Sequence, residues 1–304
     1  MLSRDKKKTR RLANSRLGAR QRASPRVESR VGAEARPAGR EKKNARVSLL
    51  AVKLIVTPLM ILAASVVGRR WGAAVGGWLV GLPLTSGPVA VFLAIEHGAS
   101  FAAEASAGSL AGVIAQAGFV LGYALAAPWG WPAGLVGGAG AFAASALALQ
   151  AGRLAPAILF ALALGALVVT LRLLPRDFRA PAPTSAPWWE IPARMALVTA
   201  LVVAVTGFAS LLGARASGVV ATFPLMGAAL GVFAHRAHGP RAGVAVLRGM
   251  TSALFAFAFF FFVVGLAIAR AGIVPAFTAA TLAALLVQAA TLRLVRGASA
   301  SPLA

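Results

Sequence analysis

Two prolines inside apolar segments, Pro83 and Pro224, mark the best candidate for a binding site. A proline removes one backbone donor and clashes with the carbonyl four residues earlier, so it kinks or breaks a helix. Within a membrane, the freed backbone groups need protein partners or a ligand. The candidate binding residues at the two breaks are Gly81, Pro83, Thr85, Ser86, Pro88, Thr222 and Pro224. They predict a small-solute or ion site where two broken helices face each other near the bilayer midplane, and the alternative is a pair of packing kinks.

A second set consists of titratable residues that could pass a proton or hold a cation. Its members are Glu96, His97, Glu104, His235 and His238. His235 and His238 are three residues apart, so on a helix they share one face and could bind a metal. The alternative, which predicts no metal site, is that all five lie at the membrane interface beside arginines or headgroups. We expect Glu104 at the start of a helix, where its charge suits the helix dipole.

Motifs of the common enzyme classes do not occur in the sequence. It has no Gly-Lys-Ser/Thr phosphate-binding loop, no Gly-x-Ser-x-Gly, no His-Glu-x-x-His and no Asp-rich metal box. The absence of cysteine excludes disulfides, cysteine-zinc sites and thiol nucleophiles. We therefore predict neither an enzyme nor a resident cofactor.

These candidate residues lie in a very apolar chain. It has 304 residues, of which 59% are apolar, and a mean hydropathy of +0.78. Soluble domains contain about 45–50% apolar residues, so a soluble enzyme is excluded. About 20 residues cross a hydrocarbon core of about 30 Å as a helix. This length predicts an all-α integral membrane protein with about nine transmembrane helices, at roughly 48–68, 74–95, 104–126, 131–150, 155–174, 191–212, 217–235, 248–269 and 273–292.

The net charge of +23 is divided between a basic tail and the apolar remainder. Residues 1–46 contain 16 Lys or Arg and 4 Asp or Glu, a balance of +12. Such a tail buries too little apolar surface to fold, so we expect it to be disordered. It has no aromatic residue to stack on a base, so no nucleic-acid partner is expected. Because every lysine except Lys53 lies in it, we hypothesise that the native chain begins between Val47 and Val52.

An internal repeat organises the rest of the chain. Aligning residues 72–126 with 213–267 at a shift of 141 gives 15 identities in 55 positions. The most specific identities are Gly77/Gly218, Pro83/Pro224, His97/His238, Gly98/Gly239 and Gly108/Gly249. At the same shift, Lys53 pairs with Arg194. The predicted parts are a first four-helix repeat at 47–150, a linker helix and loop at 151–189, a second repeat at 190–296 and a short tail at 297–304.

Five predicted helices separate the starts of the two repeats, so the second repeat enters the membrane in the opposite orientation. Inverted repeats of this kind are typical of secondary transporters. If the first helix starts outside, the inner loops hold ten arginines: Arg69, Arg70, Arg172, Arg176, Arg179, Arg236, Arg241, Arg248, Arg293 and Arg296. The outer loops then hold Arg153, Arg215 and Arg270. These loops favour an outer start by the positive-inside rule, whereas the basic tail favours the reverse.

Each repeat resembles the small four-helix bacterial inner-membrane proteins of the GlpM-like type. The resemblance comes from a basic residue in the first helix (Lys53, Arg194) and a glycine six residues before the central proline. It continues with a glycine in the third helix (Gly108, Gly249) and a proline that opens the fourth (Pro132, Pro275). In the second repeat Ala234-His235 comes about one turn later than the family's Ala-His pair. The resemblance implies a tandem, inverted duplication of that unit, and it implies no activity.

The sequence predicts a multi-pass protein of the bacterial inner membrane. The leading functional prediction is a small-solute or ion transporter that works by alternating access around Pro83 and Pro224. The alternatives are a non-transporting protein that supports envelope assembly or a partner complex, and an intramembrane enzyme. The expected partners are the lipid bilayer and an unknown small solute or ion, with a homo-oligomer as a further option.

Overall fold

The computed structural model describes residues 50–56, 58–59, 62, 83, 86–152, 154–175 and 189–299. The chain divides into two compact units, Met1–Val52 and Lys53–Ala304. In the first unit the described residues are 50–52, which are helical. The predicted disorder of residues 1–46 falls outside the described residues. All elements named below belong to the second unit.

Every regular element in the described ranges is a helix, and no strand occurs there. The elements are α5 (Ser86–His97), α6 (Ala99–Ala126), the 3-10 turn η1 (Ala127–Trp129), α7 (Trp131–Ala151), α8 (Pro156–Leu173), α9 (Glu190–Leu212), α10 (Ala214–Ala221), α11 (Leu225–His238), α12 (Pro240–Ala271) and α13 (Ile273–Ser299). Residues 53–56 are also helical.

Six helical segments of the described chain are apolar and long enough to cross a membrane. They are Ala99–Trp129, Trp131–Ala151, Pro156–Leu173, Ala214–Arg236, Pro240–Ala271 and Ile273–Thr291. The segment Thr199–Leu212 of α9 is apolar but shorter. The prediction of an all-α, multi-pass membrane protein is therefore confirmed. The first two predicted spans, 48–68 and 74–95, fall largely outside the described residues.

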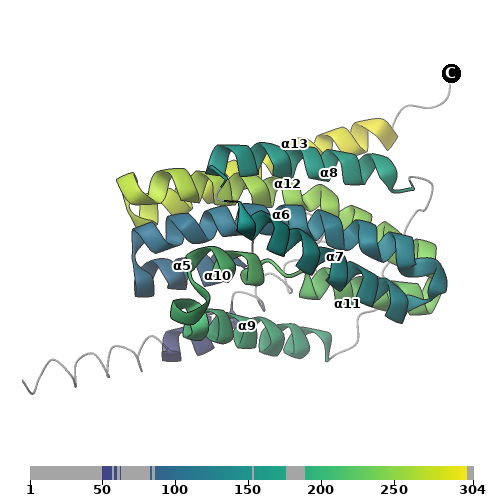
Figure 1. Ribbon diagram of the computed structural model, residues 1–304, viewed down its shortest axis with the longest axis horizontal. Coiled ribbons are helices and arrows are strands. Elements are labelled where there is room, and N and C mark those ends of the chain that lie inside the picture. The colour runs from purple at the N-terminus through teal and green to yellow at the C-terminus, as the bar shows by residue number, and fades with distance from the viewer. Residues whose placement is uncertain are drawn as a thin grey trace, which may run out of the picture. The chain divides into compact units, whose positions relative to one another are not determined.

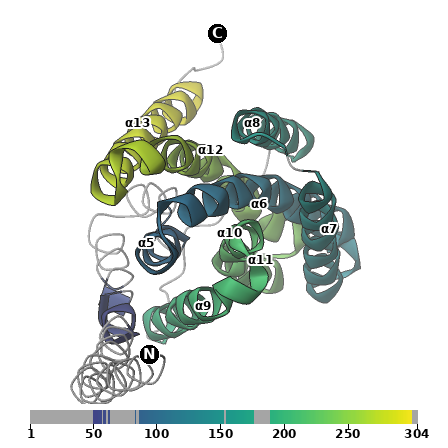
Figure 2. The same ribbon diagram turned by 60° about the vertical axis from the view of Figure 1, so that its left-hand side comes forward.

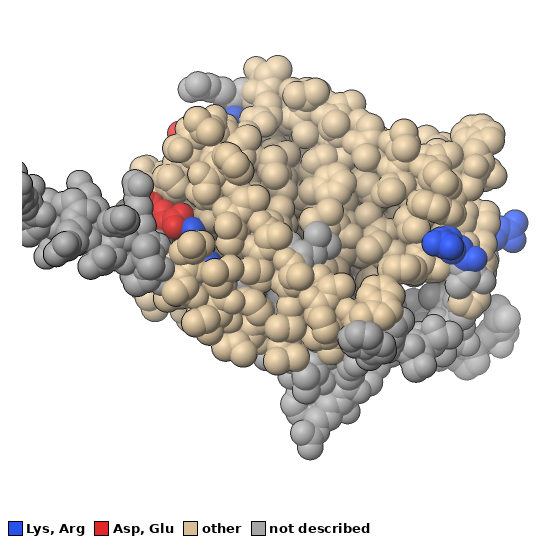
Figure 3. All heavy atoms as spheres, turned by 90° about the horizontal axis from the view of Figure 1, so that it is seen from below, with Lys and Arg blue, Asp and Glu red and all other residues tan. Residues whose placement is uncertain are grey.

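Charged side chains lie near the two ends of the helices in the face seen in Figure 3, and the tan surface between them carries none. This distribution suits helices whose middle lies in hydrocarbon and whose ends reach water. Trp129, Trp131 and Trp189 are exposed next to helix ends, the depth that tryptophan prefers in membranes. The Arg236 guanidinium lies 5.7 Å from the centre of the Trp131 ring.

Helix α6 is the centre of the fold, because α5, α7, α8, α10 and α12 all pack against it (Figures 1 and 2). Its buried residues are mostly alanine, glycine and serine, which allow close approach of neighbouring helices. A Cβ at Gly108 would overlap the Arg215 carbonyl oxygen, and a Cβ at Gly218 would overlap the Ala105 carbonyl oxygen. Helices α6 and α10 are therefore in direct backbone contact.

Helices α6 and α12 lie side by side and run in opposite directions (Figure 1). At one end, the Tyr123 hydroxyl of α6 lies 3.3 Å from the position of a Cβ on Gly243 of α12. At the other end, Ser106 Cβ lies 3.4 Å from the corresponding position on Gly265. The third helices of the two predicted repeats are thus antiparallel neighbours.

Helix α8, the predicted linker helix, packs against both α6 and α12. Two arginines hold its ends. Arg215 donates to the Leu154 carbonyl before the helix at 3.2 Å. Arg248 donates to the Leu171 and Leu174 carbonyls at 2.5 and 2.8 Å, where the last carbonyls of a helix need donors and favour a cation. Arg248 lies inside α12 rather than in a loop, which corrects its prediction as a loop arginine.

Two expectations about helix boundaries differ from the structure. The third predicted helix begins at Ala99 instead of at 104, because Gly98 takes a positive φ of 88° and ends α5. Glu104 therefore lies in the second turn of α6, and its predicted role at the helix start was wrong. The predicted span 217–235 consists of two helices, α10 and α11, separated at residues 222–224.

Candidate functional site

The second proline break separates α10 from α11. Pro224 has no N–H to donate, so α10 ends at Ala221 and α11 begins at Leu225. Thr222 satisfies part of the freed backbone, since its N–H and its hydroxyl both donate to the Val219 carbonyl, at 3.0 and 2.6 Å. The Thr222 side chain is buried, with 4% of its surface exposed. A buried hydroxyl therefore lies at the break, as the sequence predicts for a binding site.

The break lies against the middle of α6. A Cβ on Gly112, the residue at the midpoint of α6, would overlap Thr222 Oγ1. The next residue, Phe223, packs edge-on against Phe119 of α6 and Phe142 of α7, with ring centres 6.1 and 5.1 Å apart. Helix α6 is apolar and long enough to cross a membrane, so the break lies against the middle of a candidate span.

The first proline break precedes α5. Pro83 is buried and non-helical, and its carbonyl accepts a hydrogen bond from Gly87 N at 2.7 Å. Pro88 lies in the first turn of α5 and is buried. Ser86 is 1% exposed, and its hydroxyl has no hydrogen-bond partner among the described residues. Gly81 and Thr85 lie outside the described residues.

The helices that border the two breaks are neighbours. Helix α5, which starts after the first break, packs against α10, which ends at the second, and both pack against α6 (Figure 2). With 12 residues, α5 is about 18 Å long, which is about three fifths of a hydrocarbon core of about 30 Å. Gln116, one turn beyond Gly112 on α6, adds a buried amide that is 4% exposed and that sequence reasoning missed.

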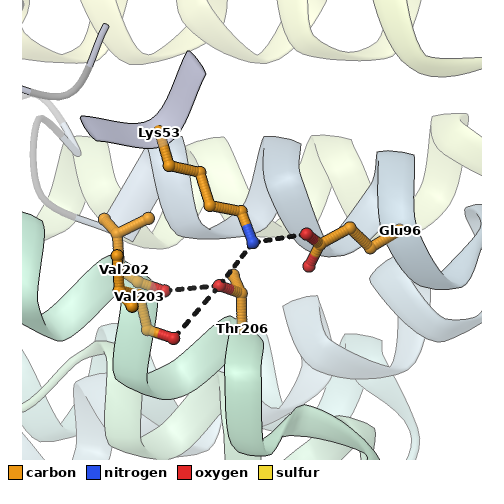
Figure 4. A network of polar contacts seen from close by, with 5 residues as sticks. All are labelled: Lys53, Glu96, Val202, Val203 and Thr206. Atoms are coloured by element: carbon orange, nitrogen blue, oxygen red, sulfur yellow. Dashed lines mark hydrogen bonds and ion pairs between the residues drawn. The ribbon is translucent and has the colours of Figure 1, made fainter. Parts of the chain in front are cut away.

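A partly buried ion pair and a hydrogen bond join three helical segments at the C-terminal end of α5 (Figure 4). Lys53 is 5% exposed, and its Nζ donates to Glu96 Oε1 and, at 2.8 Å, to the Thr206 hydroxyl of α9. Thr206 in turn donates to the Val202 carbonyl at 2.6 Å. The Lys53 Nζ also lies 5.5 Å from the centre of the Phe92 ring, within the range of a cation–π contact.

Sequence reasoning selected Glu96 as a relay residue but did not identify its partners. Lys53 was used as a marker of the repeat, although a single lysine in an apolar helix is itself a signal of function. Thr206 gives no sequence signal, because it lies 153 residues from Lys53 and only the tertiary packing of α9 brings the two together. The Glu96 side chain is 23% exposed, so the carboxylate end of this pair is reachable from solvent.

A second buried polar pair lies at the opposite end of α6. The Tyr123 hydroxyl and His235 Nδ1 are 3.0 Å apart, and the two side chains are 0% and 7% exposed. Gly134 and Gly243 leave room for them, since a Cβ at either position would come within 3.1 Å of the Tyr123 ring or 2.9 Å of His235 Cβ. His235 is thus held by the chain's only tyrosine, which sequence reasoning did not select.

The remaining candidate residues lie apart from one another. His97 ends α5 and stacks on Phe101, with ring centres 4.6 Å apart. Glu104 is exposed on α6, and His238 is exposed at the end of α11. Because His235 is buried and bonded to Tyr123 while His238 faces outward, the two histidines do not form the shared metal-binding face that their spacing suggested.

A cavity of about 430 Å³ opens near the end of α6 that carries Tyr123. Its lining includes Ala127, Pro128, Pro240, Arg241 and Val244. It lies between the η1 turn and the start of α12, away from the proline breaks.

The polar groups in the membrane interior are therefore of two kinds. Neutral hydroxyl and amide groups gather near the two breaks at the middle of α6, and one charged pair lies towards the end of α5. Hydroxyl, amide and backbone groups can hold a small polar solute or a partly dehydrated ion, whereas the charged pair can exchange a proton. No family model, no curated protein and no solved structure matches this chain.

Proposed function

We propose that the chain is a transporter of a small polar solute or ion in the bacterial inner membrane. Two inverted four-helix repeats, joined by α8, surround a site at the Pro83 and Pro224 breaks. Residues 48–68 and 74–95 supply the first two of nine spans. Each half is an elaboration of the GlpM-like unit that it resembles in sequence.

Matched backbone geometry at positions 141 residues apart supports the duplication. Gly87 N donates to the Pro83 carbonyl at 2.7 Å, and Ala228 N donates to the Pro224 carbonyl at 2.7 Å. At the C-terminal ends of the same helices, α5 and α11, Gly98 N donates to the Ala94 carbonyl at 3.0 Å, and Gly239 N donates to the His235 carbonyl at 2.9 Å. The antiparallel packing of α6 on α12 supports the inverted orientation, because these are equivalent helices of the two halves.

The observation that carries the transport proposal is the Thr222–Pro224 break against the middle of α6. Broken helices at the interface of inverted repeats are where secondary transporters bind substrate, because unwound backbone and hydroxyl groups are available there. Ser86, Thr222 and Gln116 are buried neutral side chains at the two breaks or on the helices that border or contact them. A small neutral or singly charged solute suits this lining.

The test is solute flux into proteoliposomes that contain the purified full chain. The probes are neutral amino acids, mono- and dicarboxylates, sugars, Na⁺ and K⁺, each with and without an imposed pH gradient. Wild type should transport one of these classes, and Pro224→Ala and Pro83→Ala should abolish the flux while inserting normally. Pro240→Ala is the matched control, because Pro240 occupies the first turn of α12, where proline is tolerated and its removal is mild.

An absence of flux with every probe, together with a stable protein captured by cross-linking, would refute the proposal. That outcome would favour the non-transporting role in envelope assembly or a partner complex. Equal flux in wild type and Pro224→Ala would also count against a site at the break, even though transport itself would then stand.

A further inference from the structure

The Lys53–Glu96–Thr206 cluster connects the two halves of the chain. Lys53 belongs to the first predicted helix of the first half, Glu96 to α5 and Thr206 to α9, the first helix of the second half. Helix α5 packs against α9, and it starts directly after the Pro83 break. The ion pair therefore joins this short helix, which begins at the proposed substrate site, to the Lys53 segment, and the Lys53–Thr206 hydrogen bond joins that segment to the opposite half.

We propose that Glu96 is the proton-binding site that couples transport to a proton gradient, with Lys53 as its counter-charge. This inference rests on the proposed transport function. When Glu96 takes up a proton from the aqueous face, its carboxylate becomes a neutral carboxylic acid and no longer attracts the ammonium. Lys53 then keeps the Thr206 hydroxyl and the Phe92 ring, neither of which compensates a buried charge, so the contact between α5 and α9 opens. Release of the proton restores the carboxylate and closes the contact.

The geometry favours a proton over a metal cation. The Lys53 ammonium already occupies the position at the Glu96 carboxylate that a cation would take. A metal ion would have to displace it and would find one hydroxyl, Thr206, as a further ligand. The described residues contain no group of three or more His, Cys, Asp or Glu that could hold a metal. A proton needs no ligand besides the carboxylate itself.

A coupling site needs a buried charge and a proton acceptor that solvent can reach, and Lys53 and Glu96 meet these two requirements. The Lys53 side chain is 6% exposed, so its charge depends on a partner, whereas the Glu96 side chain is 23% exposed and can exchange protons with solvent. Glu104 differs from Glu96, because it is exposed and forms no ion pair with a buried lysine or arginine among the described residues.

Other charged or titratable groups of the helices around α5 do not replace this pair. His97 follows Glu96 on α5 and stacks on Phe101 of α6. Glu104 of α6 is exposed, and Arg215 of α10 bonds to the Leu154 carbonyl. Arg270 lies exposed at the end of α12, and the described polar side chain that α9 brings to the pair is Thr206. Lys53 and Glu96 form the only ion pair among the described residues.

The pair is present in one half of the chain only. At the shift of 141, Lys53 corresponds to Arg194, but Glu96 corresponds to Ala237. The second half therefore has a basic residue without the matching carboxylate. A proton site in one repeat and none in its inverted partner makes the two faces of the transporter unequal, so that protonation favours one of the two access states.

The test uses the absence of native cysteine. Spin labels at Ile95→Cys on α5 and Leu211→Cys on α9, both exposed positions, report the distance between the two helices in the full chain. Distances are measured by EPR in proteoliposomes from about pH 4 to about pH 9, a range that includes the titration of carboxyl groups. We expect a short-distance population at high pH that is lost at low pH. Glu96→Gln should show the long distance at every pH.

The matched control is Glu104→Gln, which removes a carboxylate at the same membrane end and should keep the full pH response. A wild-type distance that does not change with pH would overturn the proposal, as would a pH response that persists in Glu96→Gln. Flux that continues in Glu96→Gln at the wild-type rate under a pH gradient would overturn the coupling role and leave transport intact. If no probe is transported by wild type, the function proposed above fails instead.

Discussion

Gly98 and Gly239 lie 141 residues apart and adopt the same backbone conformation, with φ and ψ of 88° and 172° in one and 85° and 176° in the other. Each glycine ends one helix of a hairpin and precedes the next, since Gly98 joins α5 to α6 and Gly239 joins α11 to α12. A positive φ at both positions explains the identity, because glycine adopts it without a steric cost. Since α6 and α12 are antiparallel, the two turns lie at opposite ends of this helix pair.

The first prediction is that these turns lie on opposite faces of the membrane. Ser100→Cys, at the start of α6, and His238→Cys, at the end of α11, are exposed sites in a chain that lacks native cysteine. In oriented vesicles, a membrane-impermeant maleimide should label one variant from outside and the other only after permeabilisation. Labelling of both variants from the same side would exclude the inverted orientation.

The close approach of α10 to α6 predicts a strong position dependence of glycine substitutions. Gly218→Ala should destabilise the fold by about 1–3 kcal/mol, because the added Cβ overlaps the Ala105 carbonyl and forces the helices apart. Gly249→Ala is the matched variant, since its Cβ meets open space. It should be neutral or stabilise by up to about 1 kcal/mol, as expected for glycine to alanine within a helix. SDS titration of unfolding in mixed micelles measures both. Equal stabilities of the two variants would show that the contact is not tight.

Hydropathy alone was sufficient to predict the long helices. The predicted spans 131–150, 155–174 and 273–292 coincide closely with α7, α8 and the apolar part of α13. The break at Pro224 was also predictable, because it follows from the missing N–H of one residue. These features depend on local sequence, so periodicity and residue type are enough to find them.

The pairing of side chains was not predictable in the same way. Lys53 meets Glu96 and Thr206 across 43 and 153 residues, and Tyr123 meets His235 across 112. Each contact depends on the packing of α5 against α9 or of α11 against α12, which no single segment specifies. The start of α6 was misplaced because apolar residues continue through Gly98, and only the backbone angle of that glycine separates the two helices.

The buried ion pair predicts a non-additive pair of substitutions. Glu96→Gln leaves the Lys53 charge buried without a counter-charge and should cost about 3 kcal/mol of unfolding free energy. Lys53→Met combined with Glu96→Gln should recover most of that loss, because replacing a buried ion pair by neutral groups is close to neutral. SDS-titration unfolding of the single and double variants gives the interaction energy. Strictly additive losses would indicate that the two residues are independent.

The Tyr123–His235 contact predicts a loss on removal of one hydroxyl. Tyr123→Phe keeps the packed ring but leaves the buried His235 Nδ1 without its partner, which should cost about 1–3 kcal/mol. The control is His238→Ala, because His238 is exposed and lies on α11, the helix that carries His235. This substitution should change the free energy of unfolding by less than about 0.5 kcal/mol. Both values come from the same SDS titration. A Tyr123→Phe variant as stable as wild type would mean that the hydrogen bond contributes nothing to the fold.

The most direct test of alternating access at the breaks is the reactivity of Thr222→Cys. Thr222 is 4% exposed at the middle of α6, so a cysteine there reacts only if the chain opens a path to the break. A membrane-impermeant methanethiosulfonate reagent should modify it from each side of the membrane in separate experiments. Thr251→Cys, at a fully buried position of α12, should stay unreactive from both sides. If Thr222→Cys, in a chain that remains folded, does not react with the reagent from one or both sides of the membrane, the result would contradict a transport site at the two broken helices.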